Sequence, residues 1–145
     1  MADRFRHDQS ISDIMARDLS TVESGSTISE AARLMRDNDT GAIIVTNGDR
    51  MSGLLTDRDI AVRAVADGRD PDSTTAGDIA STDVISIEPS SSIGDAIKAM
   101  REANIRRVPV VEDGRPVGVV SLGDLAIALD EESALADISS GRQNN

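Results

Sequence analysis

A hydroxyl side chain stands three residues before an aspartate in two similar phrases of this sequence, GLLTDRDIA and GVVSLGDLA. If each phrase ends a strand and begins a helix, the Asp59 or Asp124 carboxylate can accept hydrogen bonds from two ribose hydroxyls. The Thr56 or Ser121 hydroxyl can then reach a phosphate or the ribose, and the first N–H groups of the helix face an anion. Each phrase is therefore a candidate for binding a ribose phosphate.

The same residue types are also ordinary helix starters. Ser, Thr and Asp accept hydrogen bonds from the backbone N–H groups that have no partner within the first helical turn. On this interpretation Thr56, Asp57 and Asp59 serve only to begin a helix. The spacing alone favours the capping interpretation, so a binding role needs support from elsewhere in the chain.

The composition excludes several kinds of partner and chemistry. The 145 residues include 15 basic and 26 acidic ones, and the net charge of −11 disfavours nucleic acid and anionic membranes as partners. The absence of cysteine excludes disulfides, thiol catalysis and Cys-ligated zinc. The chain has one histidine, His7, for which we expect no ligand role, and one aromatic residue, Phe5. A bound ring would therefore contact aliphatic side chains and backbone.

The sequence contains no motif typical of catalysis, of a membrane span or of a signal peptide. No apolar run approaches the roughly 20 residues of a membrane span, and the N-terminus lacks the apolar core of a signal peptide, so we expect a cytoplasmic protein. The chain contains no P-loop, dinucleotide fingerprint or G-x-S-x-G motif. We therefore expect no enzyme activity, no metal site and no required cofactor.

The chain repeats itself at an interval of 65 residues. Sliding it by that distance aligns Ser12–Ala61 with Gly77–Ala126 without a gap. The identities include Gly53 with Gly118 and Asp59 with Asp124, and many conservative matches lie between them. We interpret the chain as a tandem duplication, which explains why the phrase occurs twice.

Each copy begins with a short extended segment and an amphipathic helix. Thr27 with Glu30 has the spacing of a capping box, and Ser92 with Asp95 is a looser match because it uses Asp. Apolar residues at helical spacing follow each cap and predict one buried face, formed by Ile28, Ala31, Ala32 and Met35 and by Ile93, Ala96, Ile97 and Met100.

Two apolar strands and a second helix complete each copy. The runs AIIVT and GLLT, and VPVVE and GVVS, are joined by the hairpin links NGDR and EDGR. Pro109 has no N–H, so we expect it at an edge or at the start of a strand. TDRDIAVRAVADG predicts the second helix, with Gly68 as its end, and SLGDLAIAL copies it.

The predicted fold is α/β, with two β-α-β-β-α repeats related by pseudo-two-fold symmetry. The expected boundaries are an N-terminal tail at 1–9, a first repeat at 10–68, a polar linker at 69–75, a second repeat at 76–130 and a flexible C-terminal tail at 131–145.

These features together resemble a tandem pair of cystathionine-β-synthase (CBS) domains, also called a Bateman module. The residues that carry the resemblance are DIMARDLSTV, the capped helix, IRRVPVVEDGRPVGVVS and the two opening phrases, and it covers roughly residues 10–130. The chain is also similar to small stand-alone bacterial CBS proteins of the hypoxic response type. Members of that type can carry zinc on Cys and His, but this chain has only His7, so we do not transfer the metal site.

The resemblance implies a sensor of adenosine-containing ligands. AMP, ADP or ATP is the expected ligand, with S-adenosylmethionine or NAD as a weaker expectation, in a cleft between the repeats. The resemblance also implies a homodimer of CBS pairs that signals to an unknown regulated protein in trans. The alternative is a ligand-free dimeric scaffold that keeps only the fold, for example in a stress response.

The resemblance further implies two unequal sites, because the ribose aspartate of one repeat works with basic residues of the other. For Asp59 those residues are Arg106 and Arg107, with Thr56 and Arg58 close in sequence. The expected second site has Ser121 and Asp124 but faces Gly41 and Ala42, so it lacks charged phosphate contacts. Surface ion pairing remains the alternative role for the two arginines.

Overall fold

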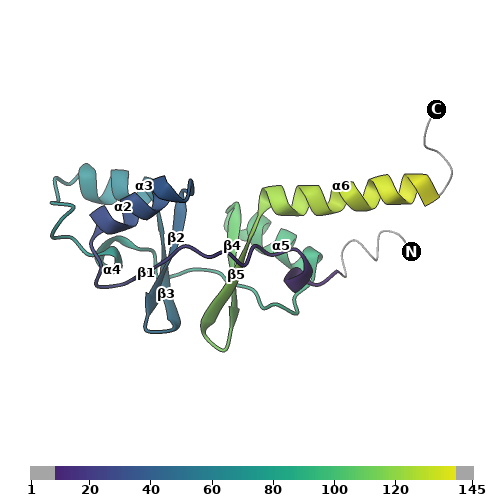
Figure 1. Cartoon of the computed structure of the whole chain (residues 1–145), viewed down its shortest axis with the longest axis horizontal. Helices are drawn as coiled ribbons and strands as arrows, with labels where there is room; N and C mark the ends of the chain where they lie inside the picture. Colours follow the sequence, from purple (N-terminus) through teal and green to yellow (C-terminus); the bar gives the residue numbers. More distant parts are fainter. Residues whose placement is uncertain (1–8, 140–145) are drawn as a thin grey trace. The chain divides into compact units, whose positions relative to one another are not determined.

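The structure is a computed structural model that describes the backbone of residues 9–139 and the side chains of residues 9–130 (Figure 1). The chain divides into two compact units. The first-repeat unit is Asp18–Val84 with Glu112–Pro116, and the second-repeat unit is Met1–Arg17 with Ile85–Val111 and Val117–Asn145. Within the described residues, no helix has the length and apolar character needed to cross a membrane.

The first-repeat unit contains a three-stranded sheet with helices beside it (Figure 1). Its strand order is β1-β2-β3, with β1 parallel and β3 antiparallel to β2. The elements in chain order are β1 (Thr21–Glu23), α2 (Ile28–Asp37), β2 (Ala42–Asn47), β3 (Arg50–Thr56), α3 (Asp57–Asp59), the π-helix η2 (Ile60–Val65) and α4 (Ala76–Ile79).

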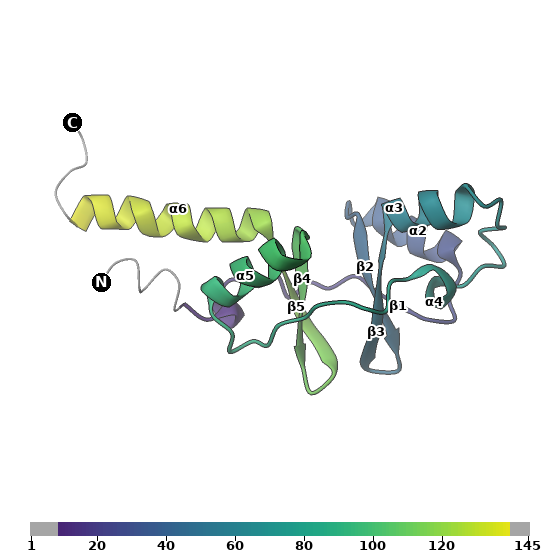
Figure 2. The same cartoon turned by 180° about the vertical axis from the view of Figure 1, so that it is seen from behind.

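The second-repeat unit repeats this arrangement around a hairpin. Figure 2 shows α5 beside the hairpin of β4 and β5, with α6 leaving the end of β5. The elements are the 3-10 helix η1 (Ile11–Asp13), α5 (Ile93–Ala103), β4 (Arg107–Glu112), β5 (Arg115–Ser121) and α6 (Leu122–Ser139). The tip of the hairpin, Glu112–Pro116, is counted in the first-repeat unit. The predicted α/β class and the two repeats are thus confirmed.

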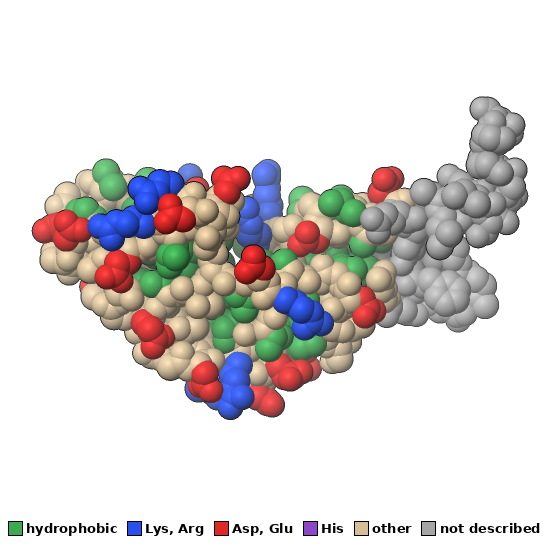
Figure 3. Space-filling model, viewed as in Figure 1, with side chains coloured by type: hydrophobic (Ala, Val, Ile, Leu, Met, Phe, Trp, Pro, Cys, Tyr) green, Lys and Arg blue, Asp and Glu red, His purple; other side chains and the backbone are tan. Residues whose placement is uncertain are grey.

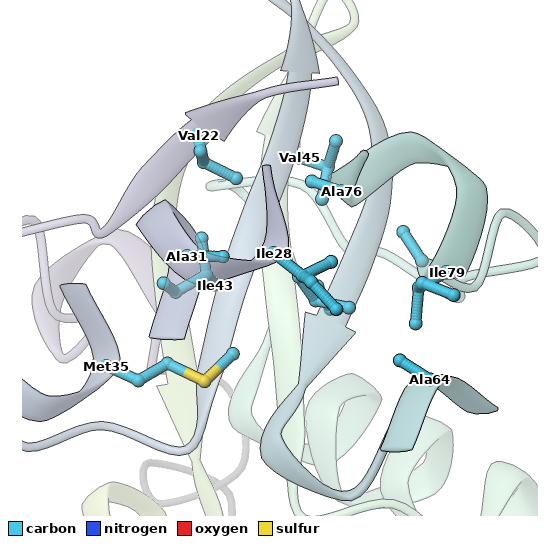
Figure 4. Packing of buried hydrophobic residues seen from close by; sticks show 11 residues of the cluster. Val22, Ile28, Ala31, Met35, Ile43, Val45, Ala64, Ala76 and Ile79 are labelled. Atoms are coloured by element: carbon cyan, nitrogen blue, oxygen red, sulfur yellow. The ribbon is translucent and has the colours of Figure 1, made fainter. Parts of the chain in front are cut away.

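Most of the predicted helix faces lie in the two cores. The prediction was wrong for Ala32, which is exposed on the side of α2 away from the core, and Ile97 is only partly buried. Ile28, Ala31 and Met35 of α2 are buried against the sheet of the first-repeat unit (Figure 4). Ile93, Ala96 and Met100 of α5 are buried in the second-repeat unit, together with strand residues. Because Ile, Val, Leu, Met and Ala fill both cores, the fold needs no aromatic packing.

Each core is completed by a segment that belongs to the other repeat in sequence. Ala76 and Ile79 of α4, which begin the second copy, are buried in the first-repeat core (Figure 4). Ile11 and Met15, which begin the first copy, are buried in the second-repeat core. The compact units are therefore interleaved with respect to the sequence repeats.

The glycine at the start of each phrase lets the segment from the other repeat lie against the strand. Leu54 and Ser81 exchange two backbone hydrogen bonds of 2.9 Å, and Ala16 with Val119 form the equivalent pair. A Cβ atom on Gly53 would lie 2.7 Å from the Ser81 carbonyl oxygen, and one on Gly118 would lie 3.1 Å from that of Ala16. A side chain at either glycine would push the crossing segment away.

In the first copy β1 pairs with β2 in parallel, and two prolines explain why the equivalent pairing is shorter in the second copy. In the first copy Ile44 N donates to Ser20 O and Ser24 N donates to Thr46 O. The residues that correspond to these two donors are Pro109 and Pro89, which have no N–H. The second copy therefore keeps only a bridge between Ile87 and Val110 beside β4, and Pro109 is the third residue of that strand.

The capping prediction was correct in position but wrong about which box is looser. Ser92 and Asp95 form a full reciprocal box, whereas the Thr27 side chain accepts from Glu30 N without a return bond. The described boxes that close all use Asp as the acid, whose shorter side chain turns back to the first residue of the box.

The last helix is longer than the sequence prediction. We expected α6 to stop near Leu129 and a flexible tail to begin at residue 131, but the helix extends to Ser139. Its added residues are mostly Glu, Ala, Leu and Ser, and the next glycine is Gly141, so the sequence offers no early stop. Residues 1–8 and 140–145, which include the rest of both predicted tails, lie outside the described residues.

The predicted linker is a hydrogen-bonded turn at the start of α2. The Asp70 carbonyl accepts from Ser73 N and Thr74 N, and Ile28 N donates to Thr74 O. Ser29 Oγ donates to Asp72 Oδ1 at 2.6 Å. The acidic residues of this segment therefore order the connection between the repeats.

We predict that Gly53→Ala lowers the free energy of unfolding by about 1–3 kcal/mol, because the added methyl group meets a backbone carbonyl that the ladder holds in place. Urea unfolding measures the change. Gly25→Ala is the matched control, since nothing lies within 4 Å of its Cβ position. Equal stability of the wild type and Gly53→Ala would show that the close contact with the Ser81 carbonyl does not require a glycine.

A second prediction concerns Asp78, which closes a capping box with Thr75 at the start of α4. Hydrogen bonds to the Thr75 side chain, then to its backbone N–H, with a smaller effect of Arg69, lower the pKa of Asp78 below 3.8. A lowered folded pKa stabilises the fold above the unfolded value, and the contribution is lost as pH falls through the folded pKa. In Thr75→Val, which keeps the backbone N–H, we expect the Asp78 pKa to rise toward 3.8, as measured by carboxyl NMR titration. An unchanged pKa would exclude the Thr75 side chain as a cause.

Candidate functional site

The first phrase forms a strand-to-helix turn closed by two reciprocal hydrogen bonds. Thr56, the last residue of β3, accepts from Asp59 N through Oγ1 at 3.0 Å, and its own N–H donates to Asp59 Oδ2 at 3.0 Å. Both side chains are partly buried. The capping interpretation of these residues is therefore correct, and the box orients the Asp59 carboxylate.

Every backbone N–H at this turn already has a partner within the chain. Asp57 N donates to Gly41 O at 3.0 Å, and Arg58 N donates to Asp57 Oδ1 at 2.8 Å. Thr56 N and Asp59 N are used by the box. The expectation that free N–H groups would face an anion is wrong for this copy, because the chain supplies its own acceptors.

The second phrase repeats the box with the same geometry. Ser121 N donates to Asp124 Oδ2 at 3.0 Å, and Asp124 N donates to Ser121 Oγ at 3.0 Å. The box in each copy engages Oδ2, so Oδ1 of the same carboxylate is the atom that a ribose hydroxyl could use. Capping and ribose binding are thus compatible in one aspartate.

The predicted basic residues are divided between the two units. Arg58 is exposed on α3, in the first-repeat unit with Thr56 and Asp59. Arg106 and Arg107 are exposed in the second-repeat unit, where Arg107 begins β4. The pairing of Asp59 with the two arginines stays a prediction.

Within its own unit, Arg106 lies at the second phrase. Leu122 N, the first N–H of α6, donates to Arg106 O at 2.8 Å. Gly41 makes the same contact with Asp57 N in the first copy. Asp57 was not among the predicted site residues, and its counterpart at an interval of 65 residues is Leu122.

Charged side chains of both signs are interspersed on the face shown in Figure 3, rather than gathered into one basic surface. Among the described residues, no group of three or more His, Cys, Asp or Glu is arranged to hold a metal ion. His7 lies outside the described residues.

The sequence and fold match known proteins over most of the chain. The sequence profile of the CBS domain matches residues 11–65 and 76–131. The CBS domain-containing protein YhcV of Bacillus subtilis is 43% identical over 126 residues, which cover 86% of this chain and 89% of that protein. Hypoxic response protein 1 of Mycobacterium tuberculosis is 38% identical over 122 residues, which cover 83% and 85%.

Solved structures show the same arrangement of elements. The crystal structure of Hypoxic Response Protein I with two coordinated zinc ions has a TM-score of 0.77 at 37% identity, covering 82% of this chain and 98% of that one. A CBS domain protein from Pyrobaculum aerophilum complexed with AMP has a TM-score of 0.75 at 32% identity, covering 87% and 99%.

We predict that Asp59→Ala and Asp95→Ala each lower the free energy of unfolding by about 0.5–2 kcal/mol when no ligand is present, because each variant opens a capping box of the same kind. Urea unfolding measures both. Asp83→Ala, an exposed acid in a loop, is the control for the lost charge. Unchanged stability of Asp59→Ala would show that its carboxylate is not an effective cap.

Proposed function

The chain belongs to the CBS domain family, and from this premise we propose that it is a regulatory module that binds an adenosine-containing ligand. Proteins built from CBS domain pairs are generally regulatory rather than catalytic. The ligand we propose is AMP, ADP or ATP, held between the repeats, and the output passes to a partner protein in trans. We further propose a cytoplasmic location, as the sequence predicts.

The observation that carries this proposal is the pair of oriented carboxylates. Each aspartate is held by a capping box at a strand-to-helix turn, with its second oxygen available for a ribose. The similar CBS domain protein from Pyrobaculum aerophilum complexed with AMP supports an adenosine ligand. A ribose bound in this way adds hydrogen bonds to carboxylates that the fold has already positioned, so little further ordering is required.

We assign the residue roles as follows. Asp59 binds the ribose of the first site, Thr56 orients that carboxylate, and Arg106 and Arg107 neutralise the phosphate, with Arg58 as a further cation. Ser121 and Asp124 form the second site, whose phosphate end is at Gly41 and Ala42. Charge-assisted contacts from arginine are the strong ones for phosphate, so we expect the first site to bind nucleotide more tightly.

The module is proposed to act as a homodimer. Val62 and Ile127 occupy equivalent positions of the two copies, in η2 and α6, and their side chains are 53% and 60% exposed. Large apolar side chains exposed at matching positions are suited to contact with a second copy of the chain. A ligand would then act by favouring one arrangement of the module, within the limit of its differential affinity.

One observation favours the alternative, a ligand-free scaffold. Thr56, Asp59, Ser121 and Asp124 all have a structural role as caps, so their presence does not require a ligand. On this alternative the exposed apolar positions would be the functional surface.

A thermal-shift screen with AMP, ADP, ATP, NAD(H) and S-adenosylmethionine distinguishes the two functions. A ligand at about 100 times its dissociation constant adds about 2.7 kcal/mol to the free energy of unfolding. We expect at least one adenosine compound to raise the melting temperature, and we expect Asp59→Ala and Arg107→Ala to abolish the rise. Asp124→Ala should have a smaller effect.

Asp95→Ala is the matched control for the screen, because it opens a capping box on α5 without touching either phrase. It should lose stability as Asp59→Ala does, yet keep the ligand-induced shift. If no adenosine compound shifts the melt, the scaffold function is correct. Loss of binding in Asp124→Ala but not in Asp59→Ala would reverse the assignment of the two sites.

A further inference from the structure

The two copies of the strand-to-helix turn carry different charges at one pair of positions. In the first copy the pair is Gly41 and Asp57, and in the second it is Arg106 and Leu122. The backbone contact is the same in both, with the N–H of the later residue donating to the carbonyl of the earlier one at 3.0 and 2.8 Å. The two copies therefore share this backbone hydrogen bond and differ in the side chains of the two residues that form it.

The Asp57 carboxylate places a negative charge beside Gly41 at the start of α3. Its Oδ1 accepts from Arg58 N at 2.8 Å. Its Oδ2 lies 3.0 Å from where a Cβ atom on Gly41 would stand, so the carboxylate lies over that glycine. An arginine side chain at position 41, as in the second copy, would have to displace it.

The second copy has no equivalent internal anion. Leu122 is 52% exposed, and its side chain has no hydrogen-bond acceptor, so it cannot cover the N–H of Gly123 as Asp57 covers that of Arg58. Arg106 adds a positive charge beside the same turn. The Arg106 position of the second copy is thus suited to a phosphate, whereas the Asp57 carboxylate opposes one at Gly41 in the first copy.

We propose that Asp57 is a specificity-determining residue that excludes phosphate from the end of the second site formed by Gly41 and Ala42. The second site would then select adenosine ligands without a phosphate, such as a nucleoside or a sulfonium nucleoside, while the first site takes the nucleotide. This inference rests on the proposed function and on its assignment of ribose and phosphate ends.

The exposure of Asp57 determines how strongly its carboxylate can repel a phosphate. Asp57 is exposed, so water and salt screen its repulsion of a phosphate a few ångströms away. We expect a change of about 3- to 10-fold in the affinity for a phosphate ligand, larger at low ionic strength, when this charge is removed.

The test is calorimetric titration of the full chain with AMP and with adenosine at two salt concentrations. Asp57→Asn keeps an acceptor for Arg58 N but removes the charge. We expect this variant to bind a second AMP about 3- to 10-fold more tightly than the wild type, with adenosine affinity unchanged. Asp67→Asn removes the same charge beyond the other end of η2 and should leave both affinities as they are.

A reciprocal pair tests the same idea in the other copy. Leu122→Asp places a carboxylate where Asp57 stands in the first copy and should weaken the tighter AMP binding by about 3- to 10-fold. Leu122→Asn, which is polar but uncharged, should not. Circular dichroism melting confirms that both variants fold.

The outcomes separate this inference from the proposed function. If adenosine and AMP bind but Asp57→Asn leaves their ratio unchanged, or Asp67→Asn changes it equally, Asp57 is not the selector and the proposed function stands. If neither AMP nor adenosine binds the wild type, this inference is overturned. The proposed function is overturned only if the other adenosine compounds of the thermal-shift screen also fail to bind.

Discussion

The reciprocal hydrogen bonds between a hydroxyl residue and an aspartate at the end of a strand organise both copies of this protein. Thr56 with Asp59, and Ser121 with Asp124, turn each hairpin into a helix and hold one carboxylate oxygen at about the usual N–H···O distance. Because a carboxylate has a second oxygen, the same interaction that begins the helix also orients a ligand acceptor. The structural and the binding interpretations of the phrase are therefore compatible.

This turn depends on a constraint three residues earlier in the same strand. The glycine at the start of each phrase lets a segment from the neighbouring repeat cross the outer strand, and that segment carries Ile79 or Met15 into the core. Neither repeat completes its own core, so each sequence repeat alone would leave apolar surface exposed. The duplication is visible in the sequence as two units in tandem, but the compact units are formed by exchange.

Small differences between the copies then decide how each could be used. Pro89 and Pro109 remove two ladder hydrogen bonds from the second copy without changing the hairpin. Asp57 and Leu122 lie on the same backbone frame, yet one supplies an internal anion and the other does not. A duplicated site can diverge in this way by side-chain charge alone, because the fold that positions those side chains is kept by the caps and the cores.

The local features of this protein could be predicted from its sequence. The repeat is visible when the sequence is aligned with itself at an interval of 65 residues. The hairpins and the position of each cap follow from patterns within about ten residues, where backbone preferences act directly. The sequence did not predict which capping box forms both of its hydrogen bonds, or that α6 extends to Ser139. At such helix ends, competing local preferences differ by small free energies. Tertiary structure alone decided that α4 completes the first core, and that Asp57 lies over Gly41. Those contacts join residues 16 or more positions apart, and packing rather than local preference selects them.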